Sequence, residues 1–335
     1  MKKFMNDPTR FVDEMIEGII AAHPDKLCFT ANDPRCLIKA GDRIKGKVGI
    51  ATGGGSGHLP LFLGYVGDGL LDGCAVGGVF QSPSSEQMLH VTKAINSGAG
   101  VLYIYGNYGG DIMNFDMAAE MAGLEDIKVE QVVAGEDVAS APKGEERKRR
   151  GVAGIFFVYK IAGAMANEMA SLAEVKRVAE KAAANVRTMG VALTPCIVPE
   201  AGRPSFTLEE NEMEIGMGIH GEPGIHRGPL KTADEIIDEI IPRILNDLPF
   251  QSGDEVAVLV NGLGATPKEE LYILYRRVSQ LMKNKGISVF KTYIGEFATS
   301  MEMAGASVSI LKLDEELRKL LSRPAESPFF EQSQI

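Results

Sequence analysis

The chain has 335 residues and a formal net charge of −10. This length exceeds the size at which one hydrophobic core usually stops growing, so we expect two domains. The acidic balance argues against nucleic acid or an anionic membrane surface as a major partner, because both favour clustered Lys and Arg side chains. We expect a small-molecule ligand instead.

Targeting and cysteine patterns are those of a cytoplasmic protein. The N-terminus reads Met1-Lys-Lys-Phe4-Met-Asn-Asp-Pro8, without a following apolar run, and no stretch approaches the roughly 20 apolar residues of a membrane-spanning helix. The four cysteines, at positions 28, 36, 74 and 196, show no CxxC spacing and are too few to staple such a chain. We therefore expect a soluble protein with reduced thiols and no membrane partner.

Strand-like and helical patterns alternate along the chain. A first helix is predicted where Asp7 and Pro8 supply an N-cap and a first helical residue. Short β-branched or aromatic runs predict strands at residues 48–52, 101–105, 129–133, 155–159 and 256–260. This alternation predicts an α/β fold, with two α/β domains that are each a sheet flanked by helices.

Three later helices are predicted to begin with S/T-x-x-E capping boxes, formed by Ser171 with Glu174, Thr232 with Glu235, and Thr266 with Glu269. After the third box, an apolar stripe at helical period comprises Leu271, Leu274, Tyr275, Val278, Leu281 and Met282. The helix after Ser171 is predicted to end near Gly190, ahead of a strand at residues 191–198. We place the domain boundary there, giving an N-terminal domain over residues 1–190 and a C-terminal domain over residues 191–335.

Two glycine-rich segments imitate nucleotide-binding motifs. Residues 41–47 have Walker A spacing, but Val48 stands where Ser or Thr holds magnesium, and the segment leads into a strand. Residues 216–221 fit the dinucleotide fingerprint, yet Pro223 follows where a phosphate-binding helix should run. We reject both matches, so in a kinase the nucleotide is expected elsewhere than on this chain.

Two candidate functional segments follow predicted strands. The run Gly53-Gly-Gly-Ser-Gly-His58 is interpreted either as a tight connection that needs positive φ or as a cradle whose bare N–H groups bind ligand oxygens. We favour the cradle. Asp111 follows the strand that ends at Tyr105, and is either a helix N-cap or a carboxylate that accepts a proton from a substrate hydroxyl.

A further candidate is His220, which lies between glycines in a segment too glycine-rich for a helix interior. Such an imidazole is usually present for its chemistry, and we expect it to form one site with His58. A metal site formed by His220, Glu222 and His226 is an alternative, but the spacing matches no standard zinc pattern, and we expect no metal. His23 and His90 are interpreted as surface or capped histidines.

Six motifs in order carry a family resemblance. They are Gly53 to His58, Asn107 to Phe115, Arg149 to Ala153, Pro204 to Leu208, Asn211 to Gly224, and Asn261 to Pro267. Together they resemble the DhaK family, the dihydroxyacetone-binding subunits of dihydroxyacetone kinases. The similarity extends from near the N-terminus to about residue 320.

The resemblance implies a homodimer of two-domain α/β subunits. It implies that His220 attacks the ketone carbon of dihydroxyacetone to form a hemiaminal, that His58 is an acid/base and hydrogen-bonding group, and that Asp111 accepts the proton of the phosphorylated hydroxyl. Gly55, Ser56 and Gly57 are implied to line the pocket. The nucleotide, ADP or ATP with magnesium, is expected on a separate DhaL-type subunit, and the phosphate is expected to come from a phosphotransferase system. This chain itself is expected to bind no cofactor.

Departures from the family pattern keep the substrate open. Gly106 stands where relatives usually have Lys, and Leu59 where they usually have Glu. A four-carbon ketose such as erythrulose is therefore an alternative to dihydroxyacetone. A non-catalytic ketose sensor that activates transcription is another, although keeping both His58 and Asp111 favours catalysis. The basic stretch from Lys143 to Arg150 is interpreted as a solvated loop or as a surface that receives an acidic partner.

Overall fold

The computed structural model describes residues 2–30 and 33–335. These residues form two compact units. One comprises Met1–Ala134, Phe157–Ala182 and Leu317–Ile335, and the other Gly135–Phe156 and Ala183–Glu316. The chain therefore passes from one unit to the other several times, which differs from the single boundary near residue 190 predicted from the sequence. That position lies inside a strand of the second unit.

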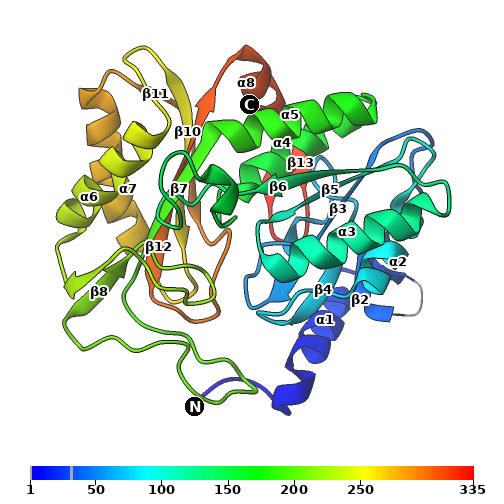
Figure 1. Ribbon diagram of the computed structural model, residues 1–335, viewed down its shortest axis with the longest axis horizontal. Helices are drawn as coiled ribbons and strands as arrows, with labels where there is room; N and C mark the ends of the chain where they lie inside the picture. Colours follow the sequence, from blue (N-terminus) through cyan, green and yellow to red (C-terminus); the bar gives the residue numbers. More distant parts are fainter. Residues whose placement is uncertain (1, 31–32) are drawn as a thin grey trace. The chain divides into compact units, whose positions relative to one another are not determined.

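A six-stranded sheet forms the centre of the first unit (Figure 1). Its order is β1-β2-β4-β3-β5-β6, and its strands are β1 (Leu27–Thr30), β2 (Asp33–Lys39), β3 (Gly49–Ser56), β4 (Gly73–Val79), β5 (Val101–Gly106) and β6 (Val129–Ala134). Strands β4, β3, β5 and β6 are parallel, while β1 and β2 add an antiparallel edge. Strands β3, β4 and β5 are buried almost throughout, as expected for strands covered on both faces, whereas the edge strand β6 is partly exposed.

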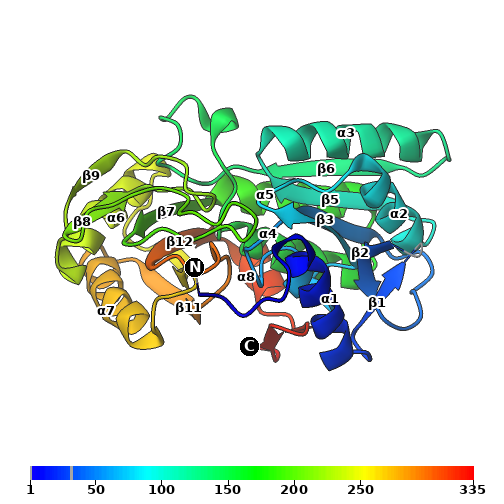
Figure 2. The same ribbon diagram turned by 90° about the horizontal axis from the view of Figure 1, so that it is seen from below.

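Helices cover both faces of this sheet. Helices α2 (Ser85–Ile95) and α3 (Gly109–Gly123) pack over one face (Figure 2). Met88 of α2, Tyr103 of β5 and Phe115 of α3 belong to the hydrophobic core on that face. Helix α4 (Ile155–Asn167) lies against the other face, where Tyr159 Oη is 2.9 Å from Thr52 Oγ1. The unit also contains α1 (Phe11–Ala22), most of α5 (Leu172–Asn185) and α8 (Glu315–Leu321), and the short pair β13 (Ala325–Glu326) and β14 (Glu331–Gln332).

The second unit is built on another six-stranded sheet, in the order β11-β10-β12-β7-β8-β9. Its strands are β7 (Val186–Ala192), β8 (Glu212–Ile215), β9 (His226–Pro229), β10 (Glu255–Gly262), β11 (Ser288–Gly295) and β12 (Gly305–Leu313). Helices α6 (Ala233–Asp247) and α7 (Lys268–Asn284) pack side by side against it (Figures 1 and 2). Both units are thus sheets flanked by helices, which confirms the predicted α/β class.

Most predicted elements are present, and the exceptions have physical causes. Residues 155–159 begin helix α4 and are not a strand. This helix is buried on nearly every side, so it lacks the apolar stripe that separates a helix from a buried strand in sequence. The helix after Ser171 ends at Asn185, and β7 begins at Val186, five residues earlier than predicted.

The structure confirms some of the three predicted capping boxes and not others. Thr232 and Glu235 form the complete reciprocal box at the start of α6, and Glu174 N–H donates to Ser171 Oγ at 3.4 Å. At the start of α7 the prediction was wrong, because Pro267 is the N-cap and the Thr266 hydroxyl donates to Gly305 O at 2.6 Å. The apolar stripe of α7 packs into the core as predicted. In the described residues, no helix combines the length and apolar character needed to cross a membrane.

Candidate functional site

The carboxyl ends of three neighbouring strands bring chemically useful residues to one edge of the first sheet. Strand β3 pairs in parallel with both β4 and β5, so all three end at the same edge. His58 follows β3 by two residues, Phe80 follows β4 directly, and Asp111 lies in the first turn of α3 after β5. His58 and Asp111, predicted independently from sequence, thus belong to the same edge.

The glycines before His58 lie mostly in strand β3 and permit close packing. A Cβ on Gly54 would lie 2.4 Å from the Phe62 ring, and one on Gly55 would lie 2.8 Å from backbone atoms of Phe80 and Gln81. Only Gly57 in this run has positive φ, at 101°. The tight-turn interpretation therefore applies at Gly57, while the preceding glycines bring two aromatic segments against the strand.

His58 itself is 1% exposed and lies between two aromatic rings. Its ring stacks on Phe80 with centroids 4.9 Å apart, and it meets Phe62 edge-on at 6.2 Å. Both phenylalanines have positive φ, 68° for Phe62 and 58° for Phe80, which is uncommon for bulky side chains and concentrates at functional sites. The backbone strain therefore falls on the two residues that hold this imidazole.

The residues around His58 line a small hollow within the first unit. Gly55, Ser56 and Gly57 belong to its wall together with His58 and Leu59. The Ser56 hydroxyl donates to Gly77 O at 2.8 Å, so its oxygen keeps acceptor capacity. That these groups bind a ligand remains a prediction.

Asp111 is a buried carboxylate near a helix N-terminus. It is 5% exposed and is the third residue of α3, whose N-cap is Tyr108. The N-cap interpretation of Asp111 was therefore wrong. In the first turn of a helix, the backbone N–H groups and the helix dipole favour an ionised carboxylate. The carboxylate form of Asp111 can accept a hydrogen bond from a hydroxyl group.

His220 lies in the second unit, in the segment between β8 and β9. Its Nδ1 is 2.9 Å from Glu222 Oε1, and its backbone N–H donates to Glu222 Oε2 at 3.0 Å. A Cβ on Gly218 would lie 2.1 Å from Glu222 Oε2, so glycine at 218 makes room for the carboxylate. The glycine-rich segment therefore folds Glu222 back onto the histidine.

The Glu222 carboxylate faces Nδ1 of the His220 ring. Burial opposes ionisation of Glu222, but the hydrogen bond and charge of His220, with Arg150 3.9 Å away, bring its pKa down to about 2. An ionised carboxylate accepts a hydrogen bond from Nδ1–H, so this contact favours the form of the His220 ring that carries a proton on Nδ1. We considered Glu222 in the sequence only as a metal ligand. A carboxylate two residues after a histidine in a glycine-rich loop was the signal for this role.

The alternative metal site at this loop is not formed. Within residues 2–30 and 33–335, the three side chains His220, Glu222 and His226 do not gather their ligand atoms. Glu222 is engaged by His220 and Arg150, while His226 is exposed at the start of β9. The rejected dinucleotide match at residues 216–221 leads into β9 and not into a helix.

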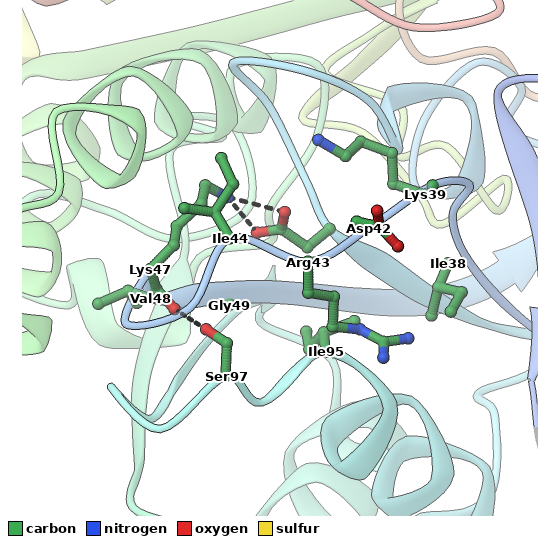
Figure 3. A pocket seen from close by; sticks show the side chains of 12 residues that line it. Ile38, Lys39, Asp42, Arg43, Ile44, Lys47, Val48, Gly49, Ile95 and Ser97 are labelled. Carbon is green, nitrogen blue, oxygen red and sulfur yellow. Dashed lines mark hydrogen bonds and ion pairs between the residues drawn. The ribbon is translucent and has the colours of Figure 1, made fainter.

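The Walker-like segment has an unrelated role. Figure 3 shows its small pocket, in which Lys47 Nζ lies 2.7 Å from both carboxylate oxygens of Asp72. Asp72 also accepts from Ile50 N–H at 2.9 Å. Lys47 thus anchors the start of β3 through a largely buried ion pair and is not directed at a phosphate.

The sequence is also similar to those of known proteins. Residues 17–329 match the Dak1 domain. The chain belongs to the Dak1 family. It is 45% identical over 98% of its length, and 99% of the relative's, to the dihydroxyacetone-binding subunit DhaK of PTS-dependent dihydroxyacetone kinase 2 from Listeria innocua.

Two other relatives show how far the Dak1 family extends. A D-erythrulose kinase from Mycolicibacterium smegmatis is 42% identical over 98% of this chain, which covers 56% of that protein. Among solved structures, the dihydroxyacetone kinase operon co-activator Dha-DhaQ has a TM-score of 0.90 at 31% identity, covering 96% of this chain and 98% of the other. The predicted membership of this family is thus confirmed.

The basic stretch of this Dak1 member serves two purposes. Lys143, Arg147 and Lys148 are exposed, as a solvated loop predicts. Arg149 is 1% exposed and makes a two-pronged contact with Asp247, at 2.8 and 2.5 Å. The second part of the stretch is therefore structural, and only its exposed lysines and Arg147 are left as a candidate partner surface.

Proposed function

We propose that this chain is the dihydroxyacetone-binding subunit of a dihydroxyacetone kinase and that His220 captures the ketose covalently. The similarity to the Listeria subunit along the full length of both chains supports the assignment. The observation that carries the chemistry is the 2.9 Å contact between His220 Nδ1 and the Glu222 carboxylate, which leaves Nε2 as the nucleophile.

Covalent capture explains how a ligand as small as a triose can be bound selectively. A triose has about six heavy atoms, and even the best small ligands gain at most about 1.5 kcal/mol per atom. Contacts of this strength distinguish a ketone poorly from glycerol. A bond from Nε2 to the carbonyl carbon forms only with an aldehyde or ketone, so the reaction itself selects the substrate.

The proposed steps balance in charge and protons. Nε2 donates its lone pair to the carbonyl carbon, and the C=O π electrons move to oxygen. The ring becomes cationic, and the ionised Glu222 stabilises it through Nδ1–H. The alkoxide oxygen takes up one proton, and Nδ1 passes its proton through the Glu222 carboxylate to water, giving a neutral hemiaminal; the group that protonates the oxygen regains its proton from water. We assign proton delivery to His58, and we assign Asp111 as the base that accepts the proton of the terminal hydroxyl as it attacks phosphorus.

The phosphoryl donor is assigned to a partner. The resemblance to DhaK subunits supports a separate DhaL-type subunit that carries ADP or ATP with magnesium, and a phosphotransferase system as the ultimate source. Residues 41–47 lead into β3 and residues 216–221 lead into β9, so neither of the two rejected nucleotide-motif matches opens a helix. A homodimer of this chain is part of the same proposal.

His220→Ala, compared with His226→Ala, tests the capture step. Calorimetric titration with dihydroxyacetone should show binding to the parent chain and to His226→Ala, and loss of at least about tenfold in affinity for His220→Ala. Undiminished binding by His220→Ala would refute covalent capture. Turnover is then measured with an ADP-loaded partner subunit, and binding without turnover would favour the co-activator role.

A four-carbon ketose is the second candidate substrate. Gly106 ends β5 at the edge that carries His58 and Asp111, and a residue without a side chain there leaves more room than the lysine of the family pattern. The similarity to a D-erythrulose kinase also supports a four-carbon substrate. Competition between dihydroxyacetone and both erythrulose enantiomers decides the point, and a clear preference for dihydroxyacetone would exclude the enlarged substrate.

A further inference from the structure

A cluster of three metal-binding side chains lies in the first unit, apart from the residues assigned above. Asp33 and Cys36 come from β2 and His90 from α2, and each offers one ligand atom, all within 4.8 Å of one another. Helix α2 lies beside β2 in both ribbon views (Figures 1 and 2). In the described parts of the chain, no other group of three such side chains meets in this way.

The local structure explains how the three side chains meet. Cys36 Sγ lies 3.4 Å from Gln87 O on α2, and His90 is three residues further along the same helix face. Residues three apart on a regular strand point to opposite faces, but the register between β1 and β2 shifts between Phe29 and Thr30. The irregular start of β2 therefore allows Asp33 to approach Cys36.

One atom in this cluster lacks a protein partner. His90 Nδ1 is buried and makes no hydrogen bond among the described residues, although we had interpreted His90 as a surface or capped histidine. A buried polar atom without a partner costs about 1–3 kcal/mol. A cation bound at Nδ1 would give this atom the partner that it lacks.

The mixture of ligand types selects the metal. Carboxylate oxygen, thiolate sulfur and imidazole nitrogen are the three ligand types of protein zinc sites. Magnesium prefers oxygen ligands and does not select a thiolate. We propose that Asp33, Cys36 and His90 bind one Zn²⁺ ion that joins β2 to α2, with a fourth position open to water. The spacing in sequence gave no sign of this site, because 54 residues separate Cys36 from His90.

Binding of zinc at this cluster has measurable consequences. Zinc binds cysteine as the thiolate, so coordination by Cys36 must displace the proton of its thiol. Zinc binding should therefore release protons and raise the melting temperature, since the ion binds the folded state. The proposal is independent of the ketose chemistry, and its test requires no turnover.

The experiment uses the full chain stripped of metal with a chelator. Zn²⁺ is titrated by calorimetry, and Co²⁺ serves as a spectroscopic probe because a cobalt–thiolate bond gives an ultraviolet charge-transfer band. We expect one ion per chain and this band in the parent. Cys36→Ser should abolish the band, and His90→Gln should weaken Zn²⁺ binding at least tenfold. Cys28→Ser and His226→Gln, which alter a thiol and an imidazole outside the cluster, should leave both unchanged.

Two outcomes would overturn the proposal. One is the absence of a cobalt–thiolate band from the folded parent chain. The other is zinc affinity that His90→Gln and Cys36→Ser leave unchanged. Circular dichroism of each metal-free variant checks folding. If Cys36→Ser fails to fold, the partly exposed Asp33→Asn replaces it, and it should keep the band while binding zinc at least several-fold more weakly; an unaltered affinity there also refutes the site.

Discussion

Replacing Glu222 with glutamine tests the tautomer argument directly. The carboxylate accepts from His220 Nδ1 and from its backbone N–H. Glu222→Gln removes the charge with little change in shape, and its amide can donate to Nδ1. Donation would place the proton on Nε2 and block the nucleophile. We therefore expect weaker ketose capture by a protein that remains folded.

The pKa of Glu222 gives the magnitude. It falls from 4.5 to about 2, which corresponds to about 3.5 kcal/mol at about 1.4 kcal/mol per unit. The side chain is 32% exposed and also faces Arg150 at 3.9 Å, so we assign about half of this energy to His220. Loss of about 1.7 kcal/mol corresponds to about twentyfold weaker capture, before any effect of the wrong tautomer.

Calorimetric titration with the ketose that the parent chain binds is the assay. Glu210→Gln, an exposed glutamate nearby, is the matched control and should bind like the parent. Because the pKa of Glu222 is lower in the folded state, its carboxylate stabilises the fold above about pH 4.5, and this stabilisation is lost as the pH falls towards 2. Glu222 therefore adds no inflection near neutral pH. A dissociation constant for Glu222→Gln within about twofold of the parent would refute the reasoning.

Three further predictions concern both units. Asp111→Asn should keep ketose binding but lower the turnover number by about 10²–10⁴-fold in a partner-coupled assay, as expected for a general base; normal turnover would remove Asp111 from that role. Gly54→Ala should destabilise the fold by about 1–3 kcal/mol in urea unfolding, because its Cβ would meet the Phe62 ring at 2.4 Å, whereas Gly18→Ala, with open space around it, should not. Burial raises the pKa of Glu136 to about 7, so the folded state keeps a proton that the unfolded state loses above about pH 4.5. The free energy of unfolding should therefore decrease as the pH rises from about 4.5 to about 7. Glu136→Gln should reduce this dependence on pH, and an unchanged dependence would contradict the prediction.

Much of the architecture was predictable because it is local. The Thr232 capping box and the apolar stripe of α7 depend on neighbours within one or two turns, and both predictions were confirmed. The α4 segment failed because a helix buried on nearly every side carries no periodic signal. The Thr266 prediction failed because its hydroxyl bonds the distant Gly305.

The residues of the candidate site could be predicted from the sequence, but their contacts could not. His58, Asp111 and His220 could be selected from glycine-rich motifs after strands, and the parallel order of β3 and β5 then placed the first two at one sheet edge. The aromatic rings around His58 could not be foreseen, because Phe80 reaches it from a different strand connection. The folding of Glu222 onto His220 depends on backbone geometry that spacing does not specify.

The amino-acid sequence by itself determined the α/β class, the family and the histidines and aspartate on which the proposed chemistry depends, since periodicity and glycine-rich motifs are written in consecutive residues. Only the tertiary structure decided the repeated crossing of the chain between two units, the contact of the Glu222 carboxylate with His220 Nδ1, and the meeting of Asp33 and Cys36 with His90. These features arise from contacts between segments distant in sequence, and strand pairing and packing set which segments meet.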